Sequence, residues 1–237
     1  MYWAAQACLD LYLATDDVDM LDLGRRCLDR LSMFQQAFDH PELSLDVFGG
    51  FGVMNADGEF NDARQGLFAP LYMDYYLATG EPELFKRGVA ALRSCFTTML
   101  TEHHYGIAPG NMKHFRPQDR GAILENYAHV GRDQVTSGYL SPDWGCGTAL
   151  YASGLAFRKF GQVFVDAPNK KAFGIDRCNA RYRSLRRGVL SIEVSGSDLG
   201  EIEIVVRDPG KRVVKLSVNG KQAKPMSDIP GRFSIVL

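Results

Sequence analysis

The chain contains an internal repeat, and this repeat constrains the fold more than any other feature of the sequence. The segment LDLYLATDDVDMLDLGRRCLDRL recurs later in the chain as MDYYLATGEPELFKRGVAALRSC. The shared threonines, Thr15 and Thr79, lie 64 residues apart, and Tyr12 pairs with Tyr76 across the same offset. Self-similarity of this kind predicts stacked copies of one supersecondary unit.

Each copy predicts a helix, a tight turn and a second helix. The turn residues are Asp-Asp in the first copy and Gly-Glu-Pro in the second. Gly80 suits the position just after a helix, and Pro82 suits the first turn of the next helix. A third, partial copy at residues 144–161, WGCGTALYASGLAFRKFG, supplies only a first helix. The sequence therefore predicts about two and a half helical hairpins over residues 1–161, with Tyr12 and Tyr76 in equivalent positions.

The pattern changes after residue 161 from the period of helices to the period of strands. The segments QVFVDA, VLSIEVSG, EIEIVVRD, VVKLSVNGK and RFSIVL alternate apolar and polar residues, with Gly, Pro and Asn-Gly between them. This alternation is typical of strands in a small β-sandwich, which we expect over residues 162–237. The predicted fold class is α+β, with helices first and strands second.

Two long connections separate the predicted hairpins, at roughly residues 38–62 and 103–143. Structureless loops of more than about 15 residues are uncommon in compact domains and are often functional. Both connections lead into a helix of the same type. Because successive hairpins pack side by side, we expect the two loops to lie on the same rim of the helical part.

Composition excludes several classes of partner. The 237-residue chain has a net charge of −1, which gives no electrostatic case for a nucleic acid or an anionic membrane surface. No apolar run is long enough to cross a bilayer. The N-terminus lacks the basic region of a signal peptide, but a longer parent protein would carry any such signal elsewhere, so localisation stays open. The five cysteines are widely spaced and contain no C-x-x-C, which favours buried free thiols.

Several stretches resemble a known group of proteins. GGFGVMNADGEFNDARQGLFAPLYMDYYLATGEPELFKRGVAALR, ENYAH, DWGCGTAL and VFVDAPNKKAFGID are similar to bacterial six-hairpin proteins of the (α/α) toroid group. That group includes many glycoside hydrolases and polysaccharide lyases. VKLSVNGKQ also resembles strands in the sandwich modules of glycan-degrading enzymes. The resemblance implies a partial (α/α) toroid followed by a β-sandwich. It also implies a glycan substrate, bound where loops enter the inner helices.

The resemblance implies an incomplete toroid, because a closed one needs six hairpins and this chain supplies fewer than half. We therefore expect either self-association or a missing N-terminal half. A preceding hairpin would cover one face of the first helix. Without it, apolar surface should be exposed around Tyr2, Trp3, Leu9 and Leu11.

The first long loop offers Asp57, Glu59, Asp62 and Arg64 as candidate site residues. On a purely structural interpretation, NADGEF is a solvated turn and Asp62 is the N-cap of a helix that begins at Ala63. On the functional interpretation, these acids serve glycoside hydrolysis, which needs two carboxyl groups across a sugar. The alternating acids lack the glycine and the distal glutamate of a calcium loop, so no metal site is predicted.

The second long loop offers Glu125, Asn126, Tyr127, His129 and Arg132, followed by Asp143 and Trp144. We expect Asp62 and Asp143 to act as acid and base, with Asp57 and Glu125 in reserve. The predicted substrate-binding residues are Tyr127, His129, Arg132, Asn126, Trp144 and Arg64. For these residues too, a structural role in an ordered loop is the alternative.

Two rival functions stay open beside hydrolysis, and none of the three needs a cofactor. A lyase that acts on uronates must neutralise a carboxylate, abstract a proton and protonate a leaving oxygen. Tyr127 and His129 would serve as its base and acid. The other rival is a non-catalytic protein that binds a glycan or a partner chain.

Overall fold

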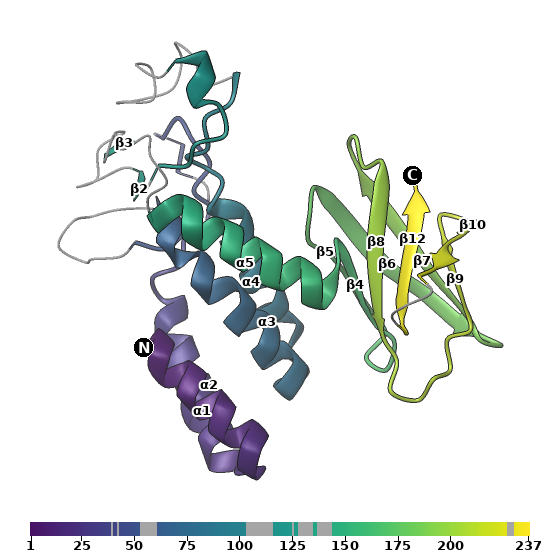
Figure 1. Ribbon diagram of the computed structural model, residues 1–237. Helices are drawn as coiled ribbons and strands as arrows, with labels where there is room; N and C mark the ends of the chain where they lie inside the picture. Colours follow the sequence, from purple (N-terminus) through teal and green to yellow (C-terminus); the bar gives the residue numbers. More distant parts are fainter. Residues whose placement is uncertain are drawn as a thin grey trace. The chain divides into compact units, whose positions relative to one another are not determined.

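The computed structural model describes residues 1–38, 40–41, 43–52, 61–102, 116–124, 126–127, 135–136, 144–226 and 230–237. For Arg64, Asn126, Val135, Thr136 and Trp144 it describes the backbone alone. The chain divides into two compact units, Met1–Ser153 and Gly154–Leu237, which are described separately. Helices come first and strands second (Figure 1), so the predicted α+β class is confirmed.

The helical unit contains the predicted hairpins. Its helices are α1 (Tyr2–Thr15), α2 (Val18–Ser32), α3 (Phe68–Thr79), α4 (Pro82–Ser94) and α5 (Trp144–Phe160), with two short 3₁₀ helices, η1 (Ala63–Leu67) and η4 (Pro117–Asp119). The first helix of each complete hairpin ends at the threonine shared by the two copies. In each hairpin the second helix begins three residues later. None of the helices in the described residues is long and apolar enough to cross a membrane.

The two hairpin turns have the same geometry. Asp16 and Gly80 both adopt the left-handed conformation, with φ values of 56° and 76°. Their backbone N–H groups donate to the carbonyl oxygens of Tyr12 and Tyr76 at 2.8 and 2.7 Å. The predicted equivalence of Tyr12 and Tyr76 is therefore confirmed. The aspartate accepts a backbone conformation that glycine adopts without strain.

The helix predicted to begin at Ala63 begins in another form. Ala63–Leu67 is the 3₁₀ helix η1, and the α-helix starts only at Phe68. Pro70 explains the delay, because a proline ring clashes with the carbonyl group four residues earlier in an α-helix, here that of Gly66. Asp62 therefore precedes a 3₁₀ turn and belongs to strand β1, and its predicted role as an α-helix N-cap is corrected.

The second unit is a sandwich of two mixed sheets. Its strands are β4 (Val163–Asp166), β5 (Lys171–Gly174), β6 (Cys178–Arg186), β7 (Val189–Gly196), β8 (Glu201–Arg207), β9 (Lys215–Val218), β10 (Lys221–Gln222), β11 (Lys224–Pro225) and β12 (Arg232–Val236). One sheet has the order β11-β12-β8-β4-β5 and the other β10-β9-β7-β6. Val165 and Ile204 from the first sheet share one buried core with Ile192 and Val218 from the second.

The predicted strands recur with small shifts, and β5, β6, β10 and β11 are additional. β6 alternates exposed arginines, such as Arg181 and Arg183, with partly buried Ala180 and Tyr182. Arg183 pairs with Glu193 on the neighbouring strand β7. These arginines thus lie on the exposed face of β6. The boundary between the two units lies between Ser153 and Gly154, inside α5. It was predicted after residue 161, just beyond the end of that helix.

Candidate functional site

The two long loops meet in a small antiparallel sheet. Its strands are β1 (Asn61–Asp62), β2 (Asn126–Tyr127) and β3 (Val135–Thr136). Asn61 lies opposite Tyr127, and Asp62 lies opposite Asn126. The prediction that the two loops lie on one rim is confirmed for these residues. We call this three-stranded sheet the loop junction.

Asp62 is fully buried at the loop junction. Its charge lies close enough to Cys95, at the C-terminal end of α4, to raise the pKa of that thiol. Burial of Cys95 is the larger cause, and together the two effects raise its pKa to about 12. The sequence thus places a carboxylate in the interior of the helical unit, at the point where the first long loop enters the helices.

Asn61, next to Asp62, links the loop junction to the helices through its amide nitrogen, and its amide oxygen is a further buried acceptor. Its Nδ2 donates to the carbonyl oxygen of Ser94 at 2.9 Å. Among the described residues its Oδ1 has no hydrogen-bond partner, although the side chain is buried. A buried acceptor without a protein donor is a natural site for a water molecule or a hydroxyl group.

Tyr127 is engaged in the structure of the loops. Its ring is fully buried in a cluster with Val47, Leu100 and Leu124. Its hydroxyl oxygen accepts hydrogen bonds from the backbone N–H groups of Ser44 and Leu45, at 3.1 and 3.3 Å. Tyr127 therefore fixes the first long loop against the second. Contact of this side chain with a substrate stays a prediction, and its burial argues for an indirect role.

The remaining predicted site residues cannot be placed in this arrangement. Asp57, Glu125, His129, Arg132 and Asp143 lie outside the described residues. The backbones of three further candidates are described without their side chains: Arg64, Asn126 and Trp144. The structure thus brings Asp62 together with the backbone of Asn126 and with Tyr127. The pairing of Asp62 with a second carboxyl group stays a prediction.

The segment GGFG explains how the first long loop is anchored. Gly49 has a φ of +85°, and a Cβ atom there would lie 2.5 Å from the backbone carbonyl of Ala90 on α4. A Cβ on Gly50 would lie 2.6 Å from Oδ1 of Asn61. Phe51 is fully buried and packs edge-on against Phe68. The glycines therefore let the loop backbone approach both α4 and the loop junction.

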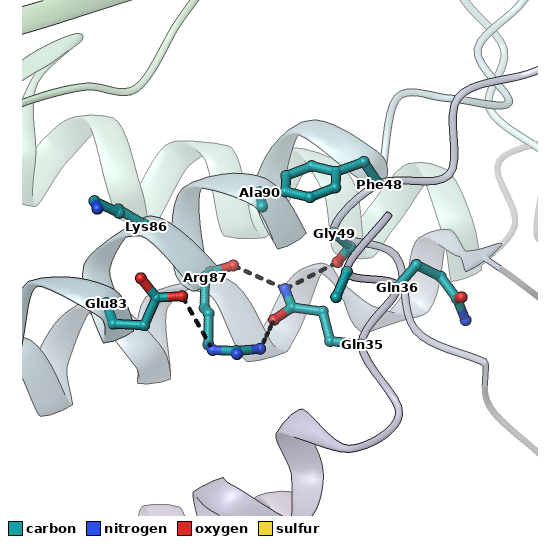
Figure 2. Close-up of a pocket in the computed structure, with 9 residues that line it drawn as sticks. Gln35, Gln36, Phe48, Gly49, Glu83, Lys86, Arg87 and Ala90 are labelled. Atoms are coloured by element: carbon teal, nitrogen blue, oxygen red, sulfur yellow. Dashed lines mark hydrogen bonds and ion pairs between the residues drawn. The ribbon is translucent and has the colours of Figure 1, made fainter. Parts of the chain in front are cut away.

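A cavity of about 400 Å³ lies beside this anchored segment. It is lined by Gln35, Gln36, Ala37, Phe48, Gly49, Glu83, Lys86, Arg87 and Ala90 (Figure 2). This volume is in the range of small-ligand pockets. The segment after α2 forms one wall, and one face of α4 forms the other. The Phe48 side chain is half exposed and supplies an aromatic surface.

Gln35 joins the two walls of this cavity. Its amide Nε2 donates to the carbonyl oxygens of Gly49 and Arg87, at 3.1 and 3.0 Å. Its Oε1 accepts from Nη1 of Arg87 at 3.1 Å, and Glu83 lies 3.6 Å from Nε of the same guanidinium (Figure 2). The guanidinium is thus fixed from two sides. The cavity offers an aromatic ring together with planar polar groups of defined orientation.

Sequence reasoning did not select Gln35, Phe48 or Arg87. Glu83, Lys86, Arg87 and Ala90 follow helical spacing on α4, but such a face is ordinarily solvated. Gln35 and Arg87 are separated by 52 residues, so no local pattern predicts their hydrogen bond. The glycine pair next to Phe48 was the available signal, because adjacent glycines often mark a close backbone approach.

Comparison with family models, curated proteins and solved structures gives no match to this chain. Within the described ranges, no group of three or more His, Cys, Asp or Glu residues is arranged to hold a metal ion. The loop junction and the cavity beside the anchored segment are the candidate functional sites among the described residues.

The environment of Cys95 has a measurable consequence. With a pKa of about 12, only about one thiol in ten thousand is ionised at pH 8, so a thiol reagent should leave Cys95 unmodified in the native protein. The pKa is raised above its ordinary value of 9.0, so the neutral thiol stabilises the fold fully below pH 9. That contribution is lost as the pH rises toward 12.

Counting the reactive thiols at pH 8, with and without denaturant, checks the first expectation. Cys27→Ala is the control, because it removes a half-buried cysteine. Unfolding midpoints at pH 8 and pH 10.5 check the second. Cys95→Ala should lose less stability than the wild type between those two pH values. Rapid native labelling of Cys95 would contradict the burial described above.

Proposed function

We propose that this protein is carbohydrate-active and cleaves a poly- or oligosaccharide by hydrolysis, at a site that includes Asp62. The observation that carries the proposal is the pairing of β1 with β2, which sets Asp62 beside Asn126. Two loops that are far apart in the sequence thereby meet beside this carboxyl group, and loops held by a rigid scaffold are where catalytic residues are commonly found. The resemblance to six-hairpin glycosidases supports the choice of substrate.

The cavity beside the junction supports a sugar as the ligand. Sugar rings pack on exposed aromatic side chains such as Phe48. Their hydroxyl groups pair with planar amides and guanidinium groups such as those of Gln36 and Arg87. The segment that carries Phe48 continues through Gly50 to the neighbourhood of Asn61. A bound glycan would therefore have polar and aromatic contacts available close to the acidic residue.

Hydrolysis is favoured over lyase chemistry by the environment of Tyr127. A lyase of the predicted kind would use the Tyr127 hydroxyl as its base. That oxygen already accepts two backbone hydrogen bonds, which occupy the lone pairs that would take a proton from a substrate. The hydrolase mechanism uses a carboxyl group as acid or base instead, and Asp62 supplies one at the loop junction.

The test is a screen of the full chain against neutral and acidic polysaccharides with two readouts. A hydrolase releases new reducing ends without ultraviolet absorbance. A lyase releases unsaturated products that absorb in the ultraviolet. We expect the first result. Absorbing products would overturn hydrolysis, and binding without any cleavage would assign the protein to a non-catalytic class.

Phe48→Ala should weaken glycan binding about tenfold, because loss of one stacking ring costs about 1 to 2 kcal/mol. The matched control is Phe38→Ala, which removes another exposed aromatic ring, one that does not line the cavity. Affinity for the glycan found in the screen, measured by isothermal titration calorimetry, checks this expectation. Equal affinities of the two variants would remove the cavity from the proposed site.

A further inference from the structure

The two hairpins share one sequence pattern, so the side of α3 that meets the first hairpin has an equivalent side on α1. By the 64-residue offset, Leu11 of α1 is equivalent to Tyr75 of α3, and Ala7 is equivalent to Leu71. Trp3, in the same way, corresponds to Leu67. Trp3, Ala7 and Leu11 lie on one side of α1 because they are spaced four residues apart. Leu71 and Tyr75 lie on the equivalent side of α3, and Leu67 directly precedes that helix. The contacts and the exposure of this side of α3 can therefore be compared with those of the equivalent side of α1.

In α3 this side packs against the preceding hairpin. The Tyr75 hydroxyl donates to the carbonyl oxygen of Ala5 on α1 at 2.7 Å. It also abuts Gly24 on α2, where a Cβ atom would collide with it. Phe68 meets Tyr2 with ring centroids 5.1 Å apart. Tyr75 is consequently fully buried, and burial raises its pKa.

In α1 the equivalent side is open to solvent. Trp3 is 74% exposed and Leu11 is 50% exposed. Ala7 and Ala14, between and beyond them, are exposed as well. We call Trp3, Ala7, Leu11 and Ala14 the α1 stripe. The exposure expected around this helix is thus confirmed at Trp3 and Leu11. It is not found at Leu9, which is buried on the opposite side, and Tyr2 is partly buried against Phe68.

The α1 stripe differs from an ordinary solvated helix face. The opposite side of α1 already contributes Ala5, Cys8 and Leu9 to the interior. A helix that is apolar over most of its surface is normally buried over most of it, as α3 is. In α1, Gln6 and Asp10 are the polar residues beside the stripe, and they are hydrogen-bonded to each other. By contrast, α2 has a charged outer face, as expected for a helix with one side in water. The sequence of α1 is therefore that of an inner helix with one neighbour missing.

We propose that the α1 stripe docks a further helical hairpin of the same repeat, which packs on α1 as the α1–α2 hairpin packs on α3. Such a hairpin presents an apolar helix and, on its second helix, a glycine like Gly24. Leu11 enters the notch at that glycine, as Tyr75 does at Gly24. Trp3 is then covered by the apolar helix.

The test is a tandem protein in which residues 1–64 are placed a second time ahead of the full chain. The added copy carries Trp3→Phe, so that fluorescence reports only Trp3 and Trp144 of the full chain. We expect the emission to shift to shorter wavelength and acrylamide quenching to fall, relative to the single chain. A matched tandem with Gly24→Leu in the added copy should quench like the single chain.

Failure of the added copy to fold is recognised by circular dichroism, since a folded hairpin raises the helical signal. A second measurement then decides. In the single chain, Leu11→Ser should leave the unfolding midpoint unchanged, whereas Tyr75→Ser should lower it strongly. An equal loss in both variants would overturn the proposal, because the stripe would already be covered.

Two further outcomes would also overturn it. A folded tandem in which Trp3 is quenched as in the single chain would show that the stripe rejects this hairpin. A stable dimer of the single chain in analytical ultracentrifugation, dissociated by Leu11→Ser, would assign the stripe to a second copy instead.

Discussion

Asp62→Asn should lower glycan cleavage by about a thousandfold or more, because an amide cannot act as the acid, base or nucleophile of hydrolysis. The variant should stay folded, since Asn has nearly the same shape and can keep hydrogen bonds at a buried position. Asp62→Ala should lose both activity and stability. Initial rates of reducing-end release and thermal unfolding of both variants check these expectations.

Asp22→Asn is the matched control for a change of one carboxylate to an amide. Asp22 lies exposed on α2, where it pairs with Arg26. This variant should cleave the glycan at the wild-type rate. If Asp62→Asn also cleaves at that rate, Asp62 has a structural role only, and the loop junction loses its proposed chemistry. A loss of activity with unchanged stability would instead separate catalysis from folding.

Gly49→Ala should destabilise the helical unit by about 3 kcal/mol. The left-handed φ alone costs an alanine about 1 kcal/mol. The new methyl group would also meet the backbone of Ala90 at 2.5 Å, and rigid backbone cannot move aside as a flexible side chain does. Chemical denaturation at constant pH measures the change in the free energy of unfolding.

Gly121→Ala separates the two causes. Gly121 has nearly the same φ, +86°, but no described atom lies within 4 Å of a Cβ placed there. Its substitution should cost only about 1 kcal/mol, the strain of the backbone conformation. Equal losses at Gly49 and Gly121 would show that the first long loop does not press against α4. The cavity lined by Phe48 and Gly49 would then lack the wall described above.

The Gly49 result bears on function as well as on stability. The same backbone approach holds Phe48 at the cavity and brings Gly50 against Asn61. If this approach is lost, binding of a glycan should weaken even where the protein stays folded. Gly49→Ala should therefore reduce binding more than Gly121→Ala does, measured under conditions where both variants are fully native.

The sequence by itself determined the two complete hairpins, their turns and the order of the helical part and the sandwich strands, but not the start of α3. The turn at Gly80-Glu81-Pro82 and the alternation in VLSIEVSG act over a few residues, where backbone conformation depends on near neighbours. The offset that relates Tyr12 to Tyr76 also predicts which residues of the two hairpins occupy equivalent positions. Turns and strands that depend on near neighbours can therefore be predicted from the sequence alone.

Tertiary structure alone decided how the site is assembled. The contact of Gln35 with Arg87, the pairing of Asp62 with Asn126 and the burial of Tyr127 all join residues more than 50 positions apart. The start of α3 at Phe68, by contrast, follows from the local clash of Pro70 with the carbonyl group of Gly66, which helical periodicity does not show. Periodicity shows which side of an element is apolar. Which neighbour covers that side depends on long-range packing, as the buried Tyr75 and the exposed Leu11 demonstrate at equivalent positions of one repeat.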